Sequence, residues 1–596
     1  MTHNFHIPVM GLAFTIDSPA RVAQYGIDSV ISIMDDDLIE KMTALYARNF
    51  KQPYEEITKK AEDFRAKRIT NYLNLLDKVV TEKFNSFKQE ITTNKLKFED
   101  FLSTLPSNSE LKEKLENVIT TQKNNIQEVK KLLDQYFHPG SIDVNIMTKV
   151  DKDNFEKGEQ LPVMYNDAHA ALRGFALSTV QSAVVFSAGM NPRLYSYLET
   201  FDNFYPDAEG RFQKKIILKV SDFRSAMIQG NFLAKKGLWV SEYRIESGLN
   251  CGGHAFATEG LLMGPIVEEF RNQKNELEQS AFSLFTKALD AKDKTIPATA
   301  PEIKITVQGG VGTAEEHQFL LSHYQVDSVG WGSPFLLVPE ATSVDQQTRS
   351  LLARAGEEDL YLSNISPLGV PFNTVKGTTN EFHKNNRIAA GKAGSSCPKK
   401  YLALSKDHDP EGICTASKKY QDLKIQELKA KTDLTPEEYS RGHAEITEKA
   451  CLCVGLANAS HLEMGIPVKG QQQGVVVCPG PNMAYFSNEV SLKDMMKHIY
   501  GEKPVENHSN RPHMFIKELY LYIDHLQQQI QSSLQLTPQK IKKLEAFKNN
   551  LLDGISYYRE LFSVTTFFRN ENGKIQSELN VCEAQVKNMK VTPELV

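Results

Sequence analysis

The sequence predicts an α/β protein built on a (β/α)8 barrel, with a long helical insertion after the second strand and a mostly helical or irregular C-terminal extension. Three observations carry this prediction. Eight short β-type runs alternate with helix-compatible segments over residues 1–340. A long stretch with helical spacing separates the second run from the third. Glycine-rich stretches follow the last two runs, where such a barrel carries its ligand-binding loops.

The eight β-type runs are rich in branched and aromatic residues and are bounded by turn residues. They cover residues 7–14, 28–34, 141–150, 183–189, 215–221, 239–247, 303–310 and 326–332. Helices are expected between them at 18–26, with Pro19 in the first turn, and at 168–179, 222–236 and 313–324. The chain from 35 to 138 breaks this rhythm and is rich in Lys, Glu, Asn, Leu and Phe at helical spacing. We therefore expect a helical insertion there.

This reading divides the chain into three regions. Residues 1–340 form the barrel with its insertion at 35–138, residues 341–500 a cysteine-containing irregular and helical extension, and residues 501–596 a helical region. The stretch from Tyr361 to Asn386 is expected to be a loop because it is rich in Asn, Gly, Pro and Thr. Two amphipathic helices are expected between Arg511 and Phe562, packed on the insertion or on another subunit. A homo-oligomer is thus one arrangement that the sequence allows.

Composition narrows the class of protein. Of the 596 residues, 41% are hydrophobic and 24% charged, as is usual for a globular protein, and the net charge of -5 argues against a general nucleic-acid binder. No apolar run reaches the roughly 18 to 20 residues that span a bilayer, so no membrane association is expected. The N-terminus lacks the pattern of a secretory signal, and a cytoplasmic location is expected. The seven cysteines are then expected to be thiols or metal ligands.

The sixth β-type run leads directly into a candidate active site. Gly252, Gly253 and His254 follow it in the segment SGLNCGGHAF. Paired glycines let the backbone approach a flat or charged ligand, and an imidazole beside them is well located to move a proton. A glycine turn with a buried, hydrogen-bonded histidine is the alternative interpretation of the same residues.

Two glycine loops predict a phosphate site. Gly309 and Gly310 follow the seventh run, whereas Gly332 and Ser333 follow the eighth. The loops after strands seven and eight of a (β/α)8 barrel commonly hold a phosphate through backbone N–H groups. Each loop alone could be a simple turn, but together they favour one shared phosphate site.

These motifs resemble a known family. The order VNIM at 144, VVFSAG at 184, IILKVSD at 216, SGLNCGGHAF at 247, VQGGVGTAEE at 307 and DSVGWGSPFLLVPE at 327 is similar to the nitronate monooxygenase (2-nitropropane dioxygenase-like) family of FMN-binding TIM barrels. The resemblance extends from Ile7 to about Glu340 when the insertion is skipped. The chain departs from the family pattern at Ser247, Asn250, Cys251 and Gly330.

The resemblance implies a cofactor and roles for individual residues. FMN would be bound with Asn145 at its ring or ribityl chain and with Gly252 and Gly253 against it. Its phosphate would be held by Gly309, Gly310, Gly332 and Ser333, and His254 matches the catalytic base. Reduced flavin carries negative charge near N1, so a nearby cation raises its potential, and Lys219 is the candidate. A lysine at the barrel rim with its ammonium in water is an equally weighted alternative.

Cysteines gather in the extension. Cys397, Cys414, Cys451 and Cys453 fall close together in the sequence, with Cys478 as a substitute ligand. Clustered thiolates in a reducing compartment predict an iron-sulfur cluster or a structural zinc. No Cys-x-x-Cys pair is present, and buried free thiols are the alternative.

Three functions remain open at this point. The first is an FMN-dependent oxidoreductase resembling nitronate monooxygenase, with His254 as general base or acid and a small-molecule substrate. The second is an FMN-dependent enoyl-thioester reductase, which needs NAD(P)H or ferredoxin as electron donor. The third is a non-catalytic flavin- or metal-binding protein.

Overall fold

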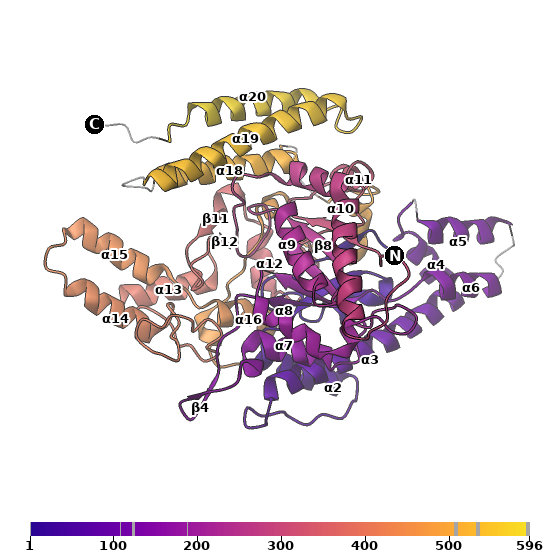
Figure 1. The fold of residues 1–596 in the computed structure, drawn as a ribbon, viewed down its shortest axis with the longest axis horizontal. Helices are drawn as coiled ribbons and strands as arrows, with labels where there is room; N and C mark the ends of the chain where they lie inside the picture. Colours follow the sequence, from indigo (N-terminus) through magenta and orange to yellow (C-terminus); the bar gives the residue numbers. More distant parts are fainter. Residues whose placement is uncertain are drawn as a thin grey trace.

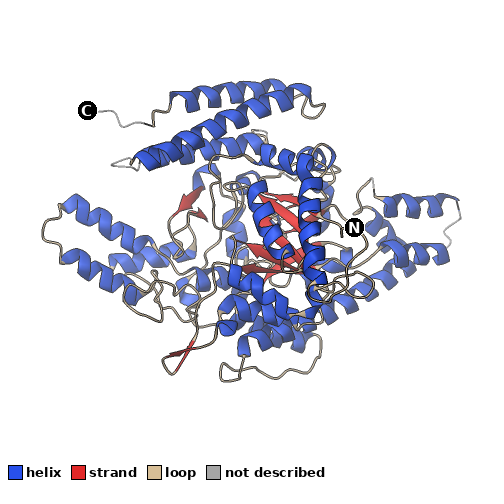
Figure 2. Cartoon of the chain, in the orientation of Figure 1, coloured by secondary structure: helices blue, strands red, loops and turns tan. Residues whose placement is uncertain are grey.

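Eight parallel strands close into a barrel in a computed structural model of the chain, which describes residues 2–107, 109–121, 126–187, 189–505, 510–531 and 537–591. The barrel strands are β1 (Phe5–Ile7), β2 (Asp28–Ser32), β3 (Ile142–Met147), β6 (Ala183–Ser187), β7 (Lys215–Val220), β8 (Val240–Glu246), β9 (Lys304–Gln308) and β10 (Ser328–Gly330). They neighbour one another in the order β1-β10-β9-β8-β7-β6-β3-β2, and Figure 2 shows them at the centre of the molecule. The predicted (β/α)8 barrel is confirmed.

Seven of the eight predicted β-type runs each contain one barrel strand. The first run, 7–14, was placed too late, because β1 begins at Phe5 and overlaps the run only at Ile7. The strand β1 ends at Ile7, residues 8–10 have no regular structure, and a turn begins at Gly11. Pro8 lacks the N–H that a ladder hydrogen bond needs, so the strand stops before it. The apolar residues that follow lie over the mouth of the barrel instead of inside its wall.

Helices surround the barrel near the predicted positions. They are α1 (Ser18–Val22) with the 3-10 turn Ala23–Tyr25, α7 (Asp167–Ala176), α8 (Pro192–Tyr197), α9 (Phe223–Ala234), α10 (Met263–Asp290) and α11 (Ala314–Ser322). Short side chains fix where two of them begin. Asp222 accepts a hydrogen bond from the Ser225 N–H at the start of α9, and Thr313 and Glu316 form a capping box at the start of α11.

The insertion between β2 and β3 is helical, as its spacing predicts. It contains α2 (Asp36–Asn49), α3 (Phe64–Thr93), α4 (Lys95–Leu102), α5 (Glu110–Thr121) and α6 (Ile126–Tyr136). The first half of α3 packs against α7 and the barrel. The rest of the insertion has a small core of its own, made by Phe84, Phe101, Leu105, Leu115, Leu133 and Phe137. In Figure 1 this arm projects from the side of the barrel opposite to α14 and α15.

The C-terminal extension shares one continuous hydrophobic core with the barrel. Its elements are α12 (Gln346–Leu352), β11 (Leu360–Ser363), β12 (Phe372–Val375), α13 (Thr379–Ala389), α14 (Lys418–Lys429), α15 (Pro436–Glu448), α16 (Leu452–Glu463) and α17 (Leu492–Ile499). A second small hairpin, β4 (Phe155–Glu156) and β5 (Glu159–Gln160), lies after β3. The expectation of a loop at 361–386 is wrong. Phe372 and Val375 are buried in the shared core, and this burial holds a hairpin that local composition does not favour.

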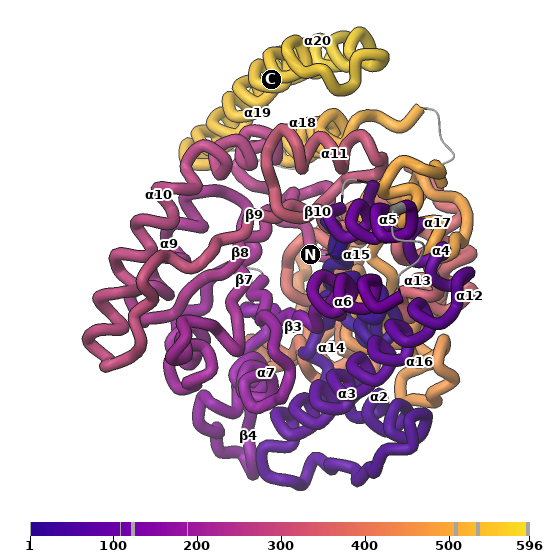
Figure 3. The backbone as a smooth tube through the Cα atoms, turned by 90° about the vertical axis from the view of Figure 1, so that its right-hand side faces the viewer, coloured from indigo at the N-terminus to yellow at the C-terminus, as the bar shows by residue number. Residues whose placement is uncertain are grey.

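Three helices cover one end of the molecule: α18 (Met514–Gln531), α19 (Pro538–Val564) and α20 (Asn572–Asn588). Figure 3 shows α18 lying over α10 and α11. The first two helices are predicted by the sequence, but they pack on α10 of the barrel rather than on the insertion. The third was not predicted, although Ile575, Leu579, Cys582 and Val586 are buried at helical spacing. Among the described residues, no helix is long and apolar enough to cross a bilayer.

Candidate active site

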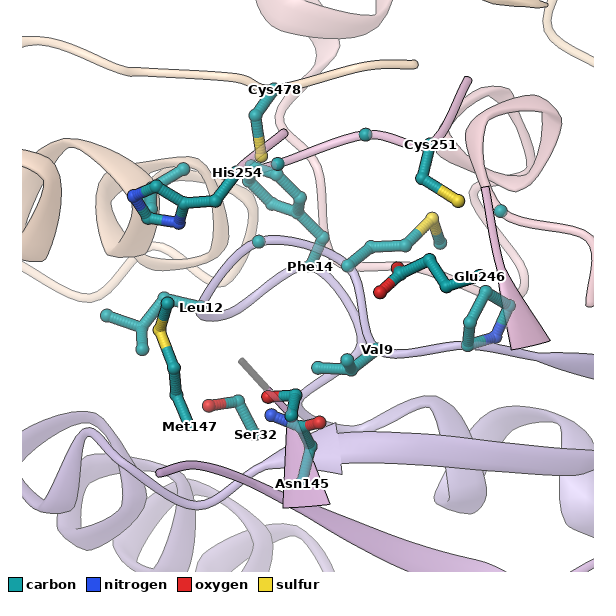
Figure 4. Close-up of a pocket in the computed structure, with 18 of the residues that line it drawn as sticks. Val9, Leu12, Phe14, Ser32, Asn145, Met147, Glu246, Cys251, His254 and Cys478 are labelled. Atoms are coloured by element: carbon teal, nitrogen blue, oxygen red, sulfur yellow. The ribbon is translucent and has the colours of Figure 1, made fainter. Parts of the chain in front are cut away.

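A cavity of about 240 Å³ opens at the carboxyl end of the barrel strands. The loops after β1, β8, β9 and β10 form its walls, and residues from the extension cover it. Figure 4 shows Asn145 and Ser32 at its base, His254 and Met147 on one side, and Glu246 on the other. Ligands bind at this end of (β/α)8 barrels because the loops there vary without disturbing the strands.

Every residue predicted to contact flavin or substrate lines this one cavity. These residues are Asn145, Lys219, Gly252, Gly253, His254, Gly309, Gly310, Gly332 and Ser333. They come from five different strand ends or loops, and barrel closure alone brings them together. Their individual roles toward FMN stay predictions.

Two amide side chains at the wall of the cavity each have an oxygen atom without a hydrogen-bond donor. Asn145 and Gln308 are each 6% exposed, and among the described residues neither Asn145 Oδ1 nor Gln308 Oε1 has a partner. A buried acceptor without a donor costs about 1–3 kcal/mol. Both residues line the cavity, so a bound ligand with N–H or O–H groups would relieve that cost. The amides fit the edge of a flavin ring, which carries both donors and acceptors.

Lys219 lies near the carboxyl end of β7 and lines the cavity. Its Nζ lies 2.8 Å from Glu246 Oε1, and Glu246 also accepts a hydrogen bond from Gln308 Nε2 at 2.8 Å. The lysine side chain is only 12% exposed, so its ammonium faces the cavity and the carboxylate rather than bulk water. Sequence reasoning missed Gln308, although its strand alternation places it on the same inward face as Thr306.

The glycines of the cavity fall into two groups. At some of them a Cβ atom would clash with a neighbouring loop, and at others the space beside the backbone is open. A Cβ on Gly309 would lie 2.6 Å from Cys251 Sγ, and one on Gly310 would clash with the Asn250 amide. Both also have positive φ, at +118° and +84°. They therefore let the 247–251 loop pack closely. Gly253 and Gly332, in contrast, have no neighbour closer than 3.5 Å on that side.

Backbone N–H groups are free where the two glycine loops meet. The strands β9 and β10 pair with Gln308 opposite Gly330, so the loops after them are adjacent. Among the described residues, no hydrogen bond is made by the N–H of Gly310, Gly332 or Ser333. The Ser333 hydroxyl accepts from the Gly480 N–H at 2.8 Å and keeps its own proton to donate. This corner fits the oxygens of a phosphate group.

His254 is held by two residues of the extension. One ring nitrogen, Nε2, hydrogen-bonds Ser366 Oγ at 2.7 Å, and the ring packs edge-on against Phe372 with centroids 4.9 Å apart. Burial, with a smaller contribution from the positive charge of Lys149, lowers the pKa of His254 to about 4. The imidazole is therefore neutral at neutral pH and able to accept a proton.

A segment of the extension, residues 478–482, closes the side of the cavity near the phosphate corner. The Cys478 carbonyl accepts a hydrogen bond from the Gly253 N–H at 3.2 Å, and a Cβ on Gly252 would lie 2.6 Å from that carbonyl oxygen. Asn482 Nδ2 donates to the Val311 carbonyl, and Arg511 donates to Asn482 and to the Gly310 carbonyl. Sequence reasoning missed this roof. Its only local signal is the Cys-Pro-Gly-Pro-Asn turn after an apolar run.

The predicted metal ligands are all free thiols in this structure. Cys414, Cys451 and Cys453 are buried, and Cys397 is half-buried. Among the described residues, no group of three or more His, Cys, Asp or Glu side chains could hold a metal ion. Neither the predicted iron-sulfur cluster nor the structural zinc at these cysteines is therefore supported. Cys453 lines the cavity described above.

Comparison with known proteins finds only weak likeness to two solved structures. No family model and no curated protein matches the chain. The enoyl reductase domain of MlnA from the macrolactin biosynthesis cluster of Bacillus amyloliquefaciens is 14% identical with a TM-score of 0.31, over 68% of this chain and 87% of that one. FabK from Thermotoga maritima is 14% identical with a TM-score of 0.30, over 63% and 79%. Likeness at this level carries no argument about function.

Proposed function

We propose that this chain is an FMN-dependent oxidoreductase whose substrate lies between the flavin and His254. One observation carries the proposal. A single cavity at the carboxyl end of the barrel holds unpartnered amide acceptors, at Asn145 and Gln308, and a corner of free backbone N–H groups. A ligand with a polar ring at one end and a phosphate at the other satisfies both sets.

The chain's own residues suggest how FMN would be held. The N–H groups of Gly310, Gly332 and Ser333 would donate to the phosphate, and Asn145 and Gln308 would hydrogen-bond the ring edge. The open side of Gly253 leaves room for a flat ring. Lys219 would supply positive charge beside it. When bound, FMN provides the two-electron chemistry of the reaction.

His254 is assigned the proton transfer. Its neutral imidazole accepts a proton from a substrate carbon atom or returns one, while Ser366 and Phe372 fix the orientation of the ring. The roof formed by residues 478–482 and by the first turn of α16 limits the entry of water to the cavity. Water exclusion strengthens each charge interaction inside the cavity.

Nitronate oxidation is the first candidate reaction, because a neutral imidazole can take the α-proton of a nitroalkane, a small carbon acid, and so form the nitronate that is oxidised. A second candidate, reduction of an enoyl thioester, is favoured by a specific observation. One wall of the cavity is apolar and is lined by Leu12, Met147, Val150, Leu368, Leu402 and Leu456. An acyl chain buries more apolar surface against such a wall than a short nitronate does.

The test begins with the purified full chain. The released chromophore is expected to be FMN by mass spectrometry, and colourless protein that does not take up added FMN would refute the proposal. Oxygen consumption with a nitronate and no NAD(P)H identifies the first reaction. Oxidation of NAD(P)H or reduced ferredoxin on adding an enoyl thioester identifies the second. A flavin that stays redox-idle in both assays identifies a binding protein instead.

A further inference from the structure

A third amide oxygen without a donor lines the cavity. Asn250 is only 2% exposed, and among the described residues its Oδ1 accepts no hydrogen bond. It belongs to the loop after β8, and no role was predicted for it from the sequence. A buried acceptor without a donor costs free energy, so a ligand group that donates to this oxygen gains affinity.

The other hydrogen bonds of Asn250 fix the direction of its amide. Its Nδ2 donates to the carbonyl of Met514, the first residue of α18, at 3.2 Å. Its backbone N–H donates to Ser247 Oγ at 3.2 Å, and that hydroxyl donates in turn to the buried carboxylate of Glu518. A rotated amide would set its oxygen against the Met514 carbonyl, acceptor against acceptor. The protein therefore uses Nδ2 and leaves Oδ1 for a ligand.

The amide lies beside the loop that joins the two proposed ends of the FMN site. Gln308 is the proposed contact of the ring edge, and the N–H of Gly310, two residues later, is a proposed contact of the phosphate. A Cβ atom on Gly310 would lie 2.1 Å from Asn250 Nδ2, so the amide packs directly against this loop. All three residues line the cavity. A ligand that reaches from Gln308 to Gly310 therefore passes Asn250.

The chemistry of an amide oxygen restricts which ligand group can satisfy it. The oxygen only accepts hydrogen bonds, and the oxygens of a phosphate monoester at neutral pH are mostly acceptors too. A hydroxyl group, in contrast, can donate to it. FMN carries hydroxyl groups on the ribityl chain between its ring and its phosphate.

We propose that Asn250 Oδ1 accepts a hydrogen bond from a ribityl hydroxyl and so selects a phosphate ligand with a hydroxylated chain. The inference rests on the proposed FMN site. It gives the C-terminal helices a part in binding, because Met514 and Glu518 of α18 hold the amide and its loop in place.

The test compares FMN with an isoalloxazine phosphate whose ribityl chain is replaced by an unhydroxylated alkyl chain of the same length. Flavin fluorescence quenching gives the affinity of each ligand for the full-length wild type and for Asn250→Ala. The wild type is expected to prefer FMN, and Asn250→Ala is expected to lower that preference about fivefold. A general loosening of the loop weakens both ligands alike and leaves the preference unchanged.

Ser247→Ala is the matched control. It removes the partner of the Asn250 N–H and a donor to Glu518 but keeps Asn250 Oδ1. It is expected to leave the preference for FMN over the analogue at the wild-type value. Because a variant could fail to fold, a crystal structure of the wild type with FMN gives a second measurement, in which a ribityl oxygen is expected within about 3.2 Å of Asn250 Oδ1.

The results that overturn the inference differ from those that overturn the FMN site. An unchanged preference in Asn250→Ala, equal wild-type affinities for the two ligands, or a ribityl chain bound away from Asn250 overturns the inference alone. A contact of Asn250 with the phosphate gives the first of these results, since both ligands carry that group. A wild-type chain that binds neither ligand overturns the inference and the proposed function together.

Discussion

Two polar layers lie one above the other inside the barrel, and they differ in how completely they are paired. In the lower layer, Arg244 Nε donates to Glu242 Oε1 at 2.8 Å, and Thr306 donates to the same carboxylate. In the upper layer, which lines the cavity, Asn145 and Gln308 keep unpartnered oxygens. Arg244, Glu242 and Thr306 are thus paired with one another, whereas these two amide oxygens have no partner among the described residues.

The two layers are separated by a single step along each strand. Side chains two residues apart share a face of a strand, so Thr306 and Gln308 point inward from β9, as Arg244 and Glu246 do from β8. Buried polar groups are tolerated where they are paired and costly where they are not. The comparison teaches that the two amides that line the cavity lack the pairing that the Arg244–Glu242 ion pair has below them. Four experiments test or sharpen that contrast, starting with the largest effect.

The lower layer is predicted to be structural. Arg244→Met leaves Glu242 buried without its ion-pair partner and is expected to lower the free energy of unfolding by about 3–5 kcal/mol. Urea unfolding measures the loss. Lys219→Met in the upper layer is the matched control, with a smaller expected loss because Glu246 stays partly exposed to the cavity. Equal losses in the two variants would contradict the contrast.

His254, at the mouth of the cavity, is predicted to take part in the reaction rather than to stabilise the fold. His254→Ala is expected to keep bound FMN but to lower turnover at least ~100-fold, the usual scale for loss of a general acid or base. Because the neutral imidazole is the active form, wild-type turnover should stay level with falling pH until about pH 4 is approached. Steady-state kinetics over pH measures both effects. Unchanged turnover in His254→Ala would remove the assigned role.

The Asn145 amide at the base of the cavity is predicted to hydrogen-bond the bound FMN. Asn145→Leu is expected to weaken FMN binding about fivefold, since one hydrogen bond is worth about 1 kcal/mol. The ligand-free protein is expected to lose no stability, because an unpaired oxygen is removed. Flavin fluorescence quenching gives the affinity. Thr306→Val in the lower layer should leave that affinity unchanged. An Asn145→Leu variant with wild-type affinity would show that the ring edge binds elsewhere.

The smallest effect concerns pH and stability. Folding lowers the pKa of His254 from 6.5 to about 4, so the unfolded chain binds the proton more readily, and this residue's contribution to stability is lost as pH falls from about 6.5 to about 4. Between about pH 6.5 and about pH 4, the free energy of unfolding of His254→Ala should therefore fall by about 1 kcal/mol less than that of the wild type. The difference is this small because His254 is partly exposed, and solvent screens its charge. Unfolding midpoints at several pH values measure it. His3 and His513, with pKa values also lowered to about 4 by burial, leave a pH dependence in both proteins.

The barrel and the glycine loops with His254 at its mouth followed from local signals in the sequence, whereas Asn145 was named through the family resemblance. Alternating β-type runs mark strands, and glycines with a histidine after a run mark its carboxyl end. In a closed parallel barrel those ends must converge, so Asn145, Lys219, His254 and Ser333 share a cavity without any knowledge of packing.

The covering of that cavity was decided by tertiary structure alone. Ser366, which orients His254, lies 112 positions from it, and Gly480 reaches Ser333 across 147 positions. Neither contact leaves a periodic or compositional trace, because each is fixed by how the extension packs into the core it shares with the barrel. Periodicity determines which way a side chain points from its own strand. Which distant segment contacts that side chain depends on how the whole chain packs to bury its apolar surface.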